Sequence, residues 1–174
     1  MDQSFERLNQ LSAARAEAEF LKCCSSTGWA KGMTEARPFE DLKSLLSKAD
    51  EIWWSLGENN WLEAFRAHPK IGEKKAATAQ SEQAQTWSAQ EQSSAQQAAV
   101  DTKVALAQGN REYEERFGFI FIICASGKSA DEILASLKQR LANDPETEIR
   151  LAAEEQRKIA QLRLTRMLAS DAST

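Results

Sequence analysis

Glycine and proline, the residues that most often end helices, are scarce in this chain. There are only seven glycines and three prolines among its 174 residues. Alanine, glutamine, glutamate, lysine and leucine, which are all good helix formers, dominate instead. A chain of this length usually forms one domain, and a hydrophobic content of 42% suffices for a buried core. We therefore expect an all-α fold, a single-domain multi-helix bundle that spans residues 1–174.

Apolar residues at helical spacing set the expected order of the helices. We expect helices over residues 2–24, 42–53, about 59–67, 88–108, 111–116, 130–142 and 146–168. A turn-rich stretch should lead to Arg37-Pro38-Phe39, and Gly109-Asn110 should break or bend the chain between two helices. Residues 72–86 are polar and of low complexity, which is typical of a loop or a weak helix. The segment from Phe117 to Ala125 is the most hydrophobic, so we expect it to be buried, either on an extended path or as the start of a buried helix.

Charge and hydropathy argue against several classes of partner. The formal net charge is −4 and no run of five or six basic residues occurs, so a nucleic-acid partner is not expected. No stretch reaches the roughly 20 apolar residues that a membrane-spanning helix needs. The acidic start MDQSFERLNQ does not resemble a signal peptide, and the final residues are not the peroxisomal signal Ser-Lys-Leu. We therefore expect a cytoplasmic protein with neither a membrane nor a nucleic-acid partner.

Cysteine and histidine are too few for the common sulfur and metal sites. Cys23 and Cys24 are neighbours rather than members of a spaced ligand set, and the three cysteines cannot all pair. His68 is the single histidine. A glycine-rich phosphate loop and a Gly-x-Ser-x-Gly nucleophile elbow are also missing from the sequence. We expect no disulfide framework, no metal and no common cofactor, so any imidazole chemistry falls to His68.

Arg163 breaks the apolar pattern of the last expected helix. Steps of 100° place seven apolar residues on one face, with Arg163 in their middle: Ile149, Ala152, Ala153, Ile159, Ala160, Leu164 and Met167. One interpretation is a buried arginine that is paired with a structural carboxylate. The other is an anion-binding residue, because a planar guanidinium holds a carboxylate through two charge-assisted hydrogen bonds. The charges within residues 131–158 fit a solvated helix face.

Glu91 is a second charge that interrupts an apolar helix face, here a negative one. It shares a helix face with Trp87, Ala95, Ala98, Thr102 and Ala105, so it should project from an inward, alanine-lined surface. The stretch Ser88-Ala89-Gln90-Glu91 also fits a capping box, in which the glutamate would only satisfy backbone N–H groups at a helix start. Both interpretations hold together if Ser88 alone caps the helix and Glu91 turns inward.

His68 stands at the expected end of a helix, because a residue before proline is pushed out of the α region. A lone histidine can be a structural hydrogen-bonding residue or a catalyst. The presence of Glu91 and Arg163 in the same chain favours the interpretation of His68 as a catalyst. An imidazole that titrates near neutral pH, a carboxylate and an arginine are the minimum parts of an acid/base site that acts on an anionic substrate.

Six short motifs follow one another along the chain: Leu8-Asn9, Arg37-Pro38-Phe39, His68-Pro69-Lys70-Ile71-Gly72, Ser88-Ala89-Gln90-Glu91-Gln92, Phe117-Gly118-Phe119-Ile120-Phe121-Ile122 and Lys158-Ile159-Ala160-Gln161-Leu162-Arg163-Leu164. In order and spacing they resemble the OHCU decarboxylase family over nearly the whole chain. OHCU is 2-oxo-4-hydroxy-4-carboxy-5-ureidoimidazoline, which this family converts to (S)-allantoin in urate and purine degradation. The resemblance implies a helical bundle that works without metal or organic cofactor, commonly as a homodimer.

The resemblance also implies roles for single residues. His68 would be the catalytic acid/base, Glu91 would assist at the reacting centre, and Arg163 would hold the substrate. Further substrate contacts would come from Pro69, Ser88, Gln92, Phe121, Ile122, Ile123, Cys124 and Ala125. Two alternatives remain open: a non-catalytic ureide-binding helical bundle, and a helical interaction module whose charges pair with one another.

Overall fold

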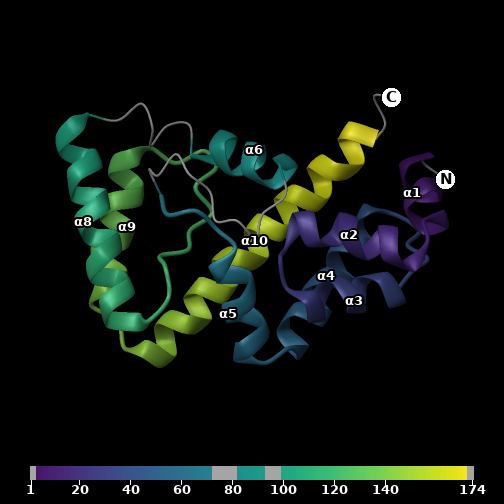
Figure 1. Ribbon diagram of the computed structural model, residues 1–174, viewed down its shortest axis with the longest axis horizontal. Helices are drawn as coiled ribbons and strands as arrows, with labels where there is room; N and C mark the ends of the chain where they lie inside the picture. The colour runs from purple at the N-terminus through teal and green to yellow at the C-terminus, as the bar shows by residue number, and fades with distance from the viewer. Residues whose placement is uncertain (1–2, 72–81, 93–98, 172–174) are drawn as a thin grey trace. The chain divides into compact units, whose positions relative to one another are not determined.

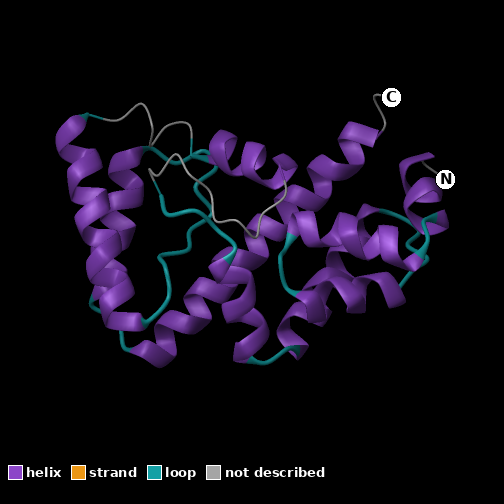
Figure 2. Cartoon of the chain, viewed as in Figure 1, coloured by secondary structure: helices purple, strands orange, loops and turns teal. Residues whose placement is uncertain are grey.

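The computed structural model describes residues 3–71, 82–92 and 99–171, and within these ranges all regular secondary structure is helical (Figure 2). The expected all-α fold is confirmed. None of the described helices is long and apolar enough to cross a membrane. The chain forms two compact units, residues 1–64 with 157–174 and residues 65–156. Whether the two units behave as the single domain expected from the sequence stays a prediction.

The first unit is built around a helix that the sequence did not reveal. Its helices are α1 (Gln3–Gln10), α2 (Ala13–Cys23), α3 (Thr27–Glu35), α4 (Leu42–Ser55), most of α5 (Glu58–Arg66) and the second part of α10 (Pro145–Asp171) (Figure 1). Helix α3 packs against both α2 and α4. At its centre the rings of Phe20 and Trp29 meet edge to face, 6.0 Å apart. The expected helices that begin at 42 and near 59 are confirmed.

The expected helix over residues 2–24 is wrong, because the chain changes direction at Leu11-Ser12. Helix α1 ends at Gln10 and α2 begins at Ala13. The Ser12 hydroxyl accepts a hydrogen bond from the Arg15 N–H at 3.3 Å, which makes Ser12 the N-cap of a second helix. The apolar spacing continues through the break, so periodicity alone could not show it.

A helix also replaces the turn-rich stretch that was expected before Arg37. Ser26 caps α3 by accepting a hydrogen bond from the Trp29 N–H. Gly32 lies inside this helix, and a Cβ atom there would be 2.9 Å from Cγ2 of Ile52 on α4. The glycine therefore permits close packing of two helices and does not mark a turn.

Two of the family-like motifs hold the first unit together. The Asn9 side chain donates to the Phe39 carbonyl at 2.8 Å and accepts from the Phe39 N–H at 2.9 Å. Nη1 of Arg37 donates to the carbonyls of Leu8 and Leu11, at 3.0 and 2.7 Å. These contacts tie the end of α1 to the chain that leads into α4, which is a structural role.

In the second unit, the helices around residues 88–108 differ in length and position from the one long helix that was expected there. Its helices are α6 (Glu82–Glu91), α8 (Val100–Phe117), α9 (Ala130–Leu141) and the first part of α10. The expected helix over 88–108 is wrong, because α6 ends at Glu91 and the next described helix begins at Val100. Of the expected loop or weak helix over 72–86, residues 72–81 lie outside the described residues and residues 82–86 are helical.

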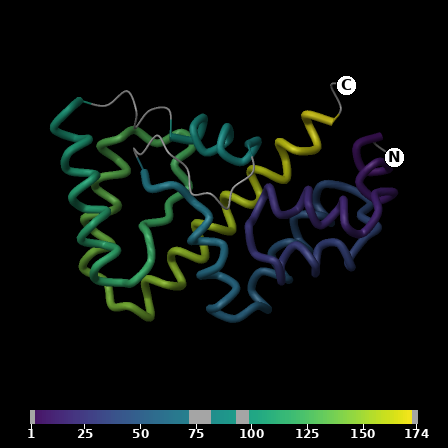
Figure 3. The backbone as a smooth tube through the Cα atoms, viewed as in Figure 1, coloured from purple at the N-terminus to yellow at the C-terminus, as the bar shows by residue number. Residues whose placement is uncertain are grey.

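Helix α8 runs without interruption through Gly109 and Asn110 and absorbs the short helix expected over 111–116. The expected break is therefore wrong. A Cβ atom on Gly109 would lie 2.6 Å from Cδ2 of Leu137, so the glycine lets α8 approach α9 closely. The backbone tubes of these two helices run side by side (Figure 3).

The second half of the hydrophobic segment Phe117 to Ala125 is buried, as expected, whereas Phe117, Phe119 and Ile120 are only partly buried. Gly118 ends the helix in the left-handed conformation, with φ 79°. Residues 120–125 then form no helix, so the alternative of a buried helix start is wrong. Phe121, Ile123 and Ala125 enter the core of this unit beside Tyr113.

The last two helices agree with the expected ranges of 130–142 and 146–168. Helix α10 begins at Pro145, where a proline is well placed. The solvated face expected for the charges within 131–158 is wrong at Arg140 and Glu148, which are buried. The uncharged Gln156 is buried as well.

Candidate functional site

His68 is anchored to α10 by a short hydrogen bond in the second unit. The residue follows α5 directly, and its N–H donates to the Phe65 carbonyl at 3.2 Å. The ring atom Nε2 lies 2.6 Å from Oε1 of Gln156. Gln156 is fully buried, whereas His68 and its neighbour Pro69 are only partly buried. One side of the imidazole is thus fixed while the residue keeps some exposure to solvent.

Ser88, Glu91 and Gln92 lie together at the C-terminal end of α6. Ser88 and Gln92 are 4% and 6% exposed, and Glu91 is half-buried. The Gln92 N–H donates to the Ser88 carbonyl at 3.1 Å, which continues the last turn of the helix. Ser88 therefore lies inside α6 and is not an N-cap, so the capping-box interpretation of Glu91 is wrong.

The segment of residues 121–125 provides the next group of candidates. Phe121, Ile122, Ile123 and Ala125 are buried, and Cys124 is partly exposed. Burial raises the pKa of the Cys124 thiol, while a hydrogen bond from the Ser126 backbone lowers it. The negative charges of Glu155 and Glu91 raise the pKa of Cys124 further. The charges of Glu91 at the end of α6 and of Glu155 on α10 therefore both act on Cys124 within the second unit.

A buried ion pair holds the same segment in place. Nε of Arg140 donates to Oε1 of Glu148 at 2.6 Å, and its Nη1 donates to the Ile122 carbonyl at 2.6 Å. The Tyr113 hydroxyl donates to the same Glu148 carboxylate. The guanidinium also lies over the Phe121 ring, 4.6 Å from its centroid. This network fixes both the backbone and one side chain of the segment that is expected to bind the substrate.

Arg163 lies on α10 in the first unit, as the helical pattern predicted, and is 1% exposed. Burial raises the pKa of Cys24 to about 12, and the positive charge of Arg163 acts in the opposite direction. The same opposition occurs at Cys23, where burial also dominates and raises the pKa. The role of Arg163, and its relation to His68 and Glu91, stay predictions.

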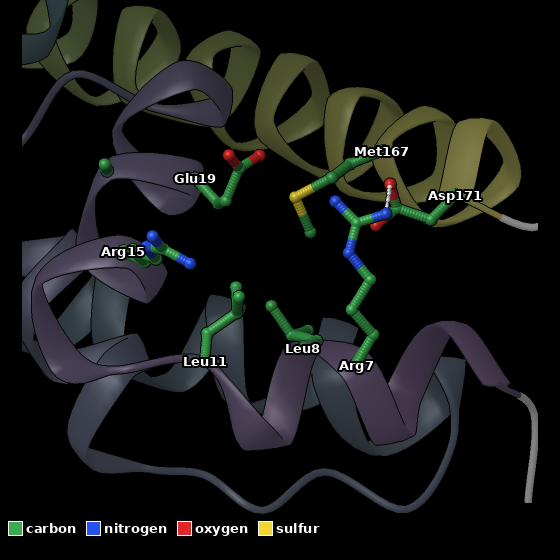
Figure 4. Close-up of a pocket in the computed structure, with 8 residues that line it drawn as sticks. Arg7, Leu8, Leu11, Arg15, Glu19, Met167 and Asp171 are labelled. Atoms are coloured by element: carbon green, nitrogen blue, oxygen red, sulfur yellow. Dashed lines mark hydrogen bonds and ion pairs between the residues drawn. The ribbon is translucent and has the colours of Figure 1, made fainter. Parts of the chain in front are cut away.

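A pocket of about 370 Å³ opens in the first unit between α1, α2 and the C-terminal end of α10 (Figure 4). Its lining combines two arginines, two acidic residues and apolar side chains: Arg7, Leu8, Leu11, Arg15, Ala18, Glu19, Met167 and Asp171. Nη1 of Arg7 pairs with Oδ1 of Asp171 at 2.9 Å. None of the site residues expected from the sequence lines this pocket.

Sequence reasoning missed Gln156, Arg140 and Glu148, all of which support the candidate site. The charges of Arg140 and Glu148 were assigned to the solvated face expected over residues 131–158, and the uncharged Gln156 was not singled out. The available signal was helical periodicity, which separates buried from exposed polar positions. It was present at Gln156, because the apolar residues that flank it are buried on the same helix: Ala152, Ala153, Ile159 and Ala160.

Comparison with known proteins agrees with this arrangement of motifs. The model of the family described as OHCU decarboxylase matches residues 9–165. The "Uric acid degradation bifunctional protein TTL" of Arabidopsis thaliana is 36% identical over 90% of the chain, and the chain spans 48% of that relative, about half its length. A 2-oxo-4-hydroxy-4-carboxy-5-ureidoimidazoline decarboxylase of Amia calva is 35% identical over 78% of the chain and 77% of its own length.

A solved structure extends the likeness to three dimensions. A crystal structure of an OHCU decarboxylase in the presence of (S)-allantoin superimposes with a TM-score of 0.75 at 37% identity. The match covers 87% of this chain and 97% of the other. On the strength of the family match and of these relatives, the chain belongs to the OHCU decarboxylase family.

Proposed function

We propose that the protein catalyses the decarboxylation of OHCU to (S)-allantoin in urate degradation, by acid/base chemistry without a cofactor. The support comes from the family match over residues 9–165 and from the likeness to a decarboxylase crystallised with (S)-allantoin. The observation that carries the proposal at the level of the site is the anchored ring of His68, whose Nε2 lies 2.6 Å from Gln156.

The chemistry asks for little more than a well-placed proton donor. The bond between the ring carbon and the carboxylate breaks, carbon dioxide leaves, and the electron pair enters the polarised ring. One proton must then be added to one face of the ring to give a single enantiomer. An imidazole exchanges protons near neutral pH, so His68 suits this step.

Glu91 is the proposed assistant at the reacting centre. Its carboxylate is half-buried at the end of α6, and its charge is felt at Cys124. Ser88 and Gln92 on the same turn, and Pro69 beside the histidine, are the proposed polar and apolar contacts. Each of them lies in the second unit with His68.

The backbone of residues 121–125 is the proposed binding edge for the ureide group. The segment is buried and forms no helix, so its N–H and C=O groups do not have helical partners. A ureide presents alternating donors and acceptors that match such a backbone. Phe121, Ile122, Ile123, Cys124 and Ala125 would contribute here.

Arg163 is the proposed binding group for the substrate carboxylate. Its burial at 1% exposure favours a strong charge-assisted hydrogen bond with an anion. The resemblance to the family also supports action as a homodimer, and a cytoplasmic location stays a proposal. Light scattering of the purified protein would give its oligomeric state, and fractionation of cells would give its location.

Circular dichroism of freshly generated OHCU tests the activity. Spontaneous decay gives racemic allantoin, whereas the enzyme should build the signal of the (S) product rapidly. The His68→Ala variant should remain folded, because the residue is only partly buried at a helix end, and should lose most of the activity. The variant Arg150→Ala, at an exposed position of α10, serves as the control and should behave as the wild type.

Two results would count against the proposal. No acceleration over buffer by the wild type would favour a binding or structural bundle, and a His68→Ala variant with normal turnover would remove His68 from the mechanism.

A further inference from the structure

Gln156 is a fully buried amide that contacts His68. It lies on α10, and Oε1 is 2.6 Å from Nε2 of His68. Its other polar atom, Nε2, is buried and has no hydrogen-bond partner among the described residues. A buried donor without a partner lowers stability, and a leucine of similar size would avoid this cost. Such a locally unfavourable choice is expected where a side chain serves function.

The hydrogen bond fixes which ring nitrogen carries the proton. An amide oxygen can only accept, so a neutral His68 that pairs with Oε1 must carry its proton on Nε2. The imidazolium carries protons on both nitrogens and can keep the same bond. The contact between His68 and Gln156 can therefore persist while a proton is gained and lost at Nδ1.

We propose that Gln156 is a positioning residue that holds the His68 ring in one orientation and in the Nε2–H tautomer, so that proton exchange with the substrate takes place at Nδ1. The proposal rests on the proposed decarboxylase function for its consequence in catalysis, but not for the tautomer itself. Gln156 acts through His68 and does not itself transfer a proton.

The single histidine of the chain makes a direct test possible. Protein without a histidine tag, labelled with ¹⁵N-histidine, gives ring signals from His68 alone in long-range proton–nitrogen spectra. At a pH where the ring is neutral, we expect one tautomer with the proton on Nε2, and a direct Nε2–H resonance that is protected from exchange with water. A proton on Nδ1, or an Nε2–H that exchanges too fast to observe, would overturn the proposal.

Two substitutions and a matched control separate positioning from simple packing. In Gln156→Leu the protected Nε2–H resonance should disappear, and in Gln156→Glu it should remain, because a carboxylate is also an acceptor. Gln161→Leu removes an amide from the same helix, where it donates to Asp50 at 2.9 Å, and should leave the histidine spectrum unchanged. If Gln156→Leu does not fold, the spectra of the wild type and of Gln156→Glu still show whether the proton of His68 lies on Nε2.

Kinetics complete the test. In Gln156→Leu, kcat should fall by roughly 10- to 100-fold while KM changes little, by analogy with the loss that follows removal of the hydrogen-bond partner of a metal-ligating histidine. A normal kcat in this variant would overturn the positioning role. An inactive wild type would instead refute the proposed function, and the nitrogen spectrum would still decide the tautomer.

Discussion

Arg163 is a buried guanidinium, and its role can be decided by a substitution that keeps the charge. Arg163→Lys retains a cation but loses the planar fork that holds a carboxylate through two bonds. Hydrogen bonds to charged groups are worth about 1.5–3 kcal/mol, so we expect kcat/KM to fall by roughly 10- to 100-fold. Steady-state kinetics and thermal unfolding of the same preparation give the two readouts.

A variant Arg163→Lys that loses stability but keeps its activity would identify Arg163 as a structural residue. Unchanged kcat/KM with a large loss of thermal stability would mean that the guanidinium mainly compensates another buried group in the first unit.

Cys124 reports on the charge of Glu91 without any substrate. Glu91 helps to raise the pKa of this thiol, so Glu91→Gln should lower that pKa and increase the thiolate fraction below it. The thiolate is the nucleophile, so alkylation by iodoacetamide near pH 8 should become faster. Mass spectrometry would follow the reaction at Cys124, because Cys23 and Cys24 are buried.

The control for this experiment is Glu115→Gln, an exposed carboxylate on α8. It should leave the alkylation rate unchanged. If Glu91→Gln also leaves the rate unchanged, the carboxylate does not lie close enough to Cys124 to share a site with it.

At the scale of helices, Gly109 decides how closely α8 and α9 pack. Gly109→Ala should gain helix propensity but would place a Cβ atom 2.6 Å from Cδ2 of the fully buried Leu137. Overpacking of a core outweighs that gain, so we expect a net destabilisation of about 1–2 kcal/mol in urea unfolding. Gly57→Ala is the matched control, since no atom lies within 4 Å of the added Cβ, and should stay within about 1 kcal/mol of the wild type. Equal stability of the two variants would contradict the tight contact.

The helices show what could be predicted from the sequence and why the rest could not. Helices α9 and α10 were predicted closely, because Ser129 caps the first and Pro145 begins the second. Helices α1 and α2 were predicted as one helix, and α3 was missed. Ser12 caps α2 and Ser26 caps α3, but the spacing of the apolar residues does not change at either serine. Glycines were taken as breaks where tertiary packing uses them for close contact.

The candidate site was predictable where a residue contradicts its surroundings. Arg163 was found because a charge interrupted an apolar face, and its burial is confirmed. His68 was found because it is the single histidine of the chain, and the proline after it indicated its place at a helix end. Gln156 was missed although buried apolar residues flank it on the same helix, because an uncharged amide interrupts an apolar face less plainly than a charge does. Its hydrogen bond to His68 in the structure identifies it.

At the scale of the whole molecule, both borders between the two units fall inside helices. One lies in α5, between Ala64 and Phe65, and the other lies in α10, between Gln156 and Arg157. Helix formation is cooperative along the chain, so the unfolding of one unit removes helical neighbours from the other. We therefore expect a single unfolding transition, in agreement with the one domain predicted from the sequence.

The distribution of tryptophan makes this testable. Trp29, Trp53, Trp54 and Trp61 all belong to the first unit, and Trp87 is the one in the second. In a Trp87→Phe background, fluorescence therefore reports the first unit alone, whereas far-UV circular dichroism reports helices of both. Glu148→Gln leaves Arg140 buried without its ion pair in the second unit and should cost about 3–5 kcal/mol. Tyr113→Phe removes the hydroxyl that donates to the same carboxylate and accepts from Nη2 of Arg140 at 3.4 Å, but it keeps the ion pair and should cost less, about 1–3 kcal/mol.

In one cooperative molecule, both substitutions lower the urea midpoint seen by first-unit fluorescence as much as the midpoint seen by circular dichroism, although neither residue belongs to the first unit. If the fluorescence midpoint stays at its original value while part of the circular dichroism signal is lost earlier, the two units unfold independently. The single-domain prediction would then be wrong, and the substitutions that act on His68 and on Arg163 would have to be interpreted as changes in separate folding units.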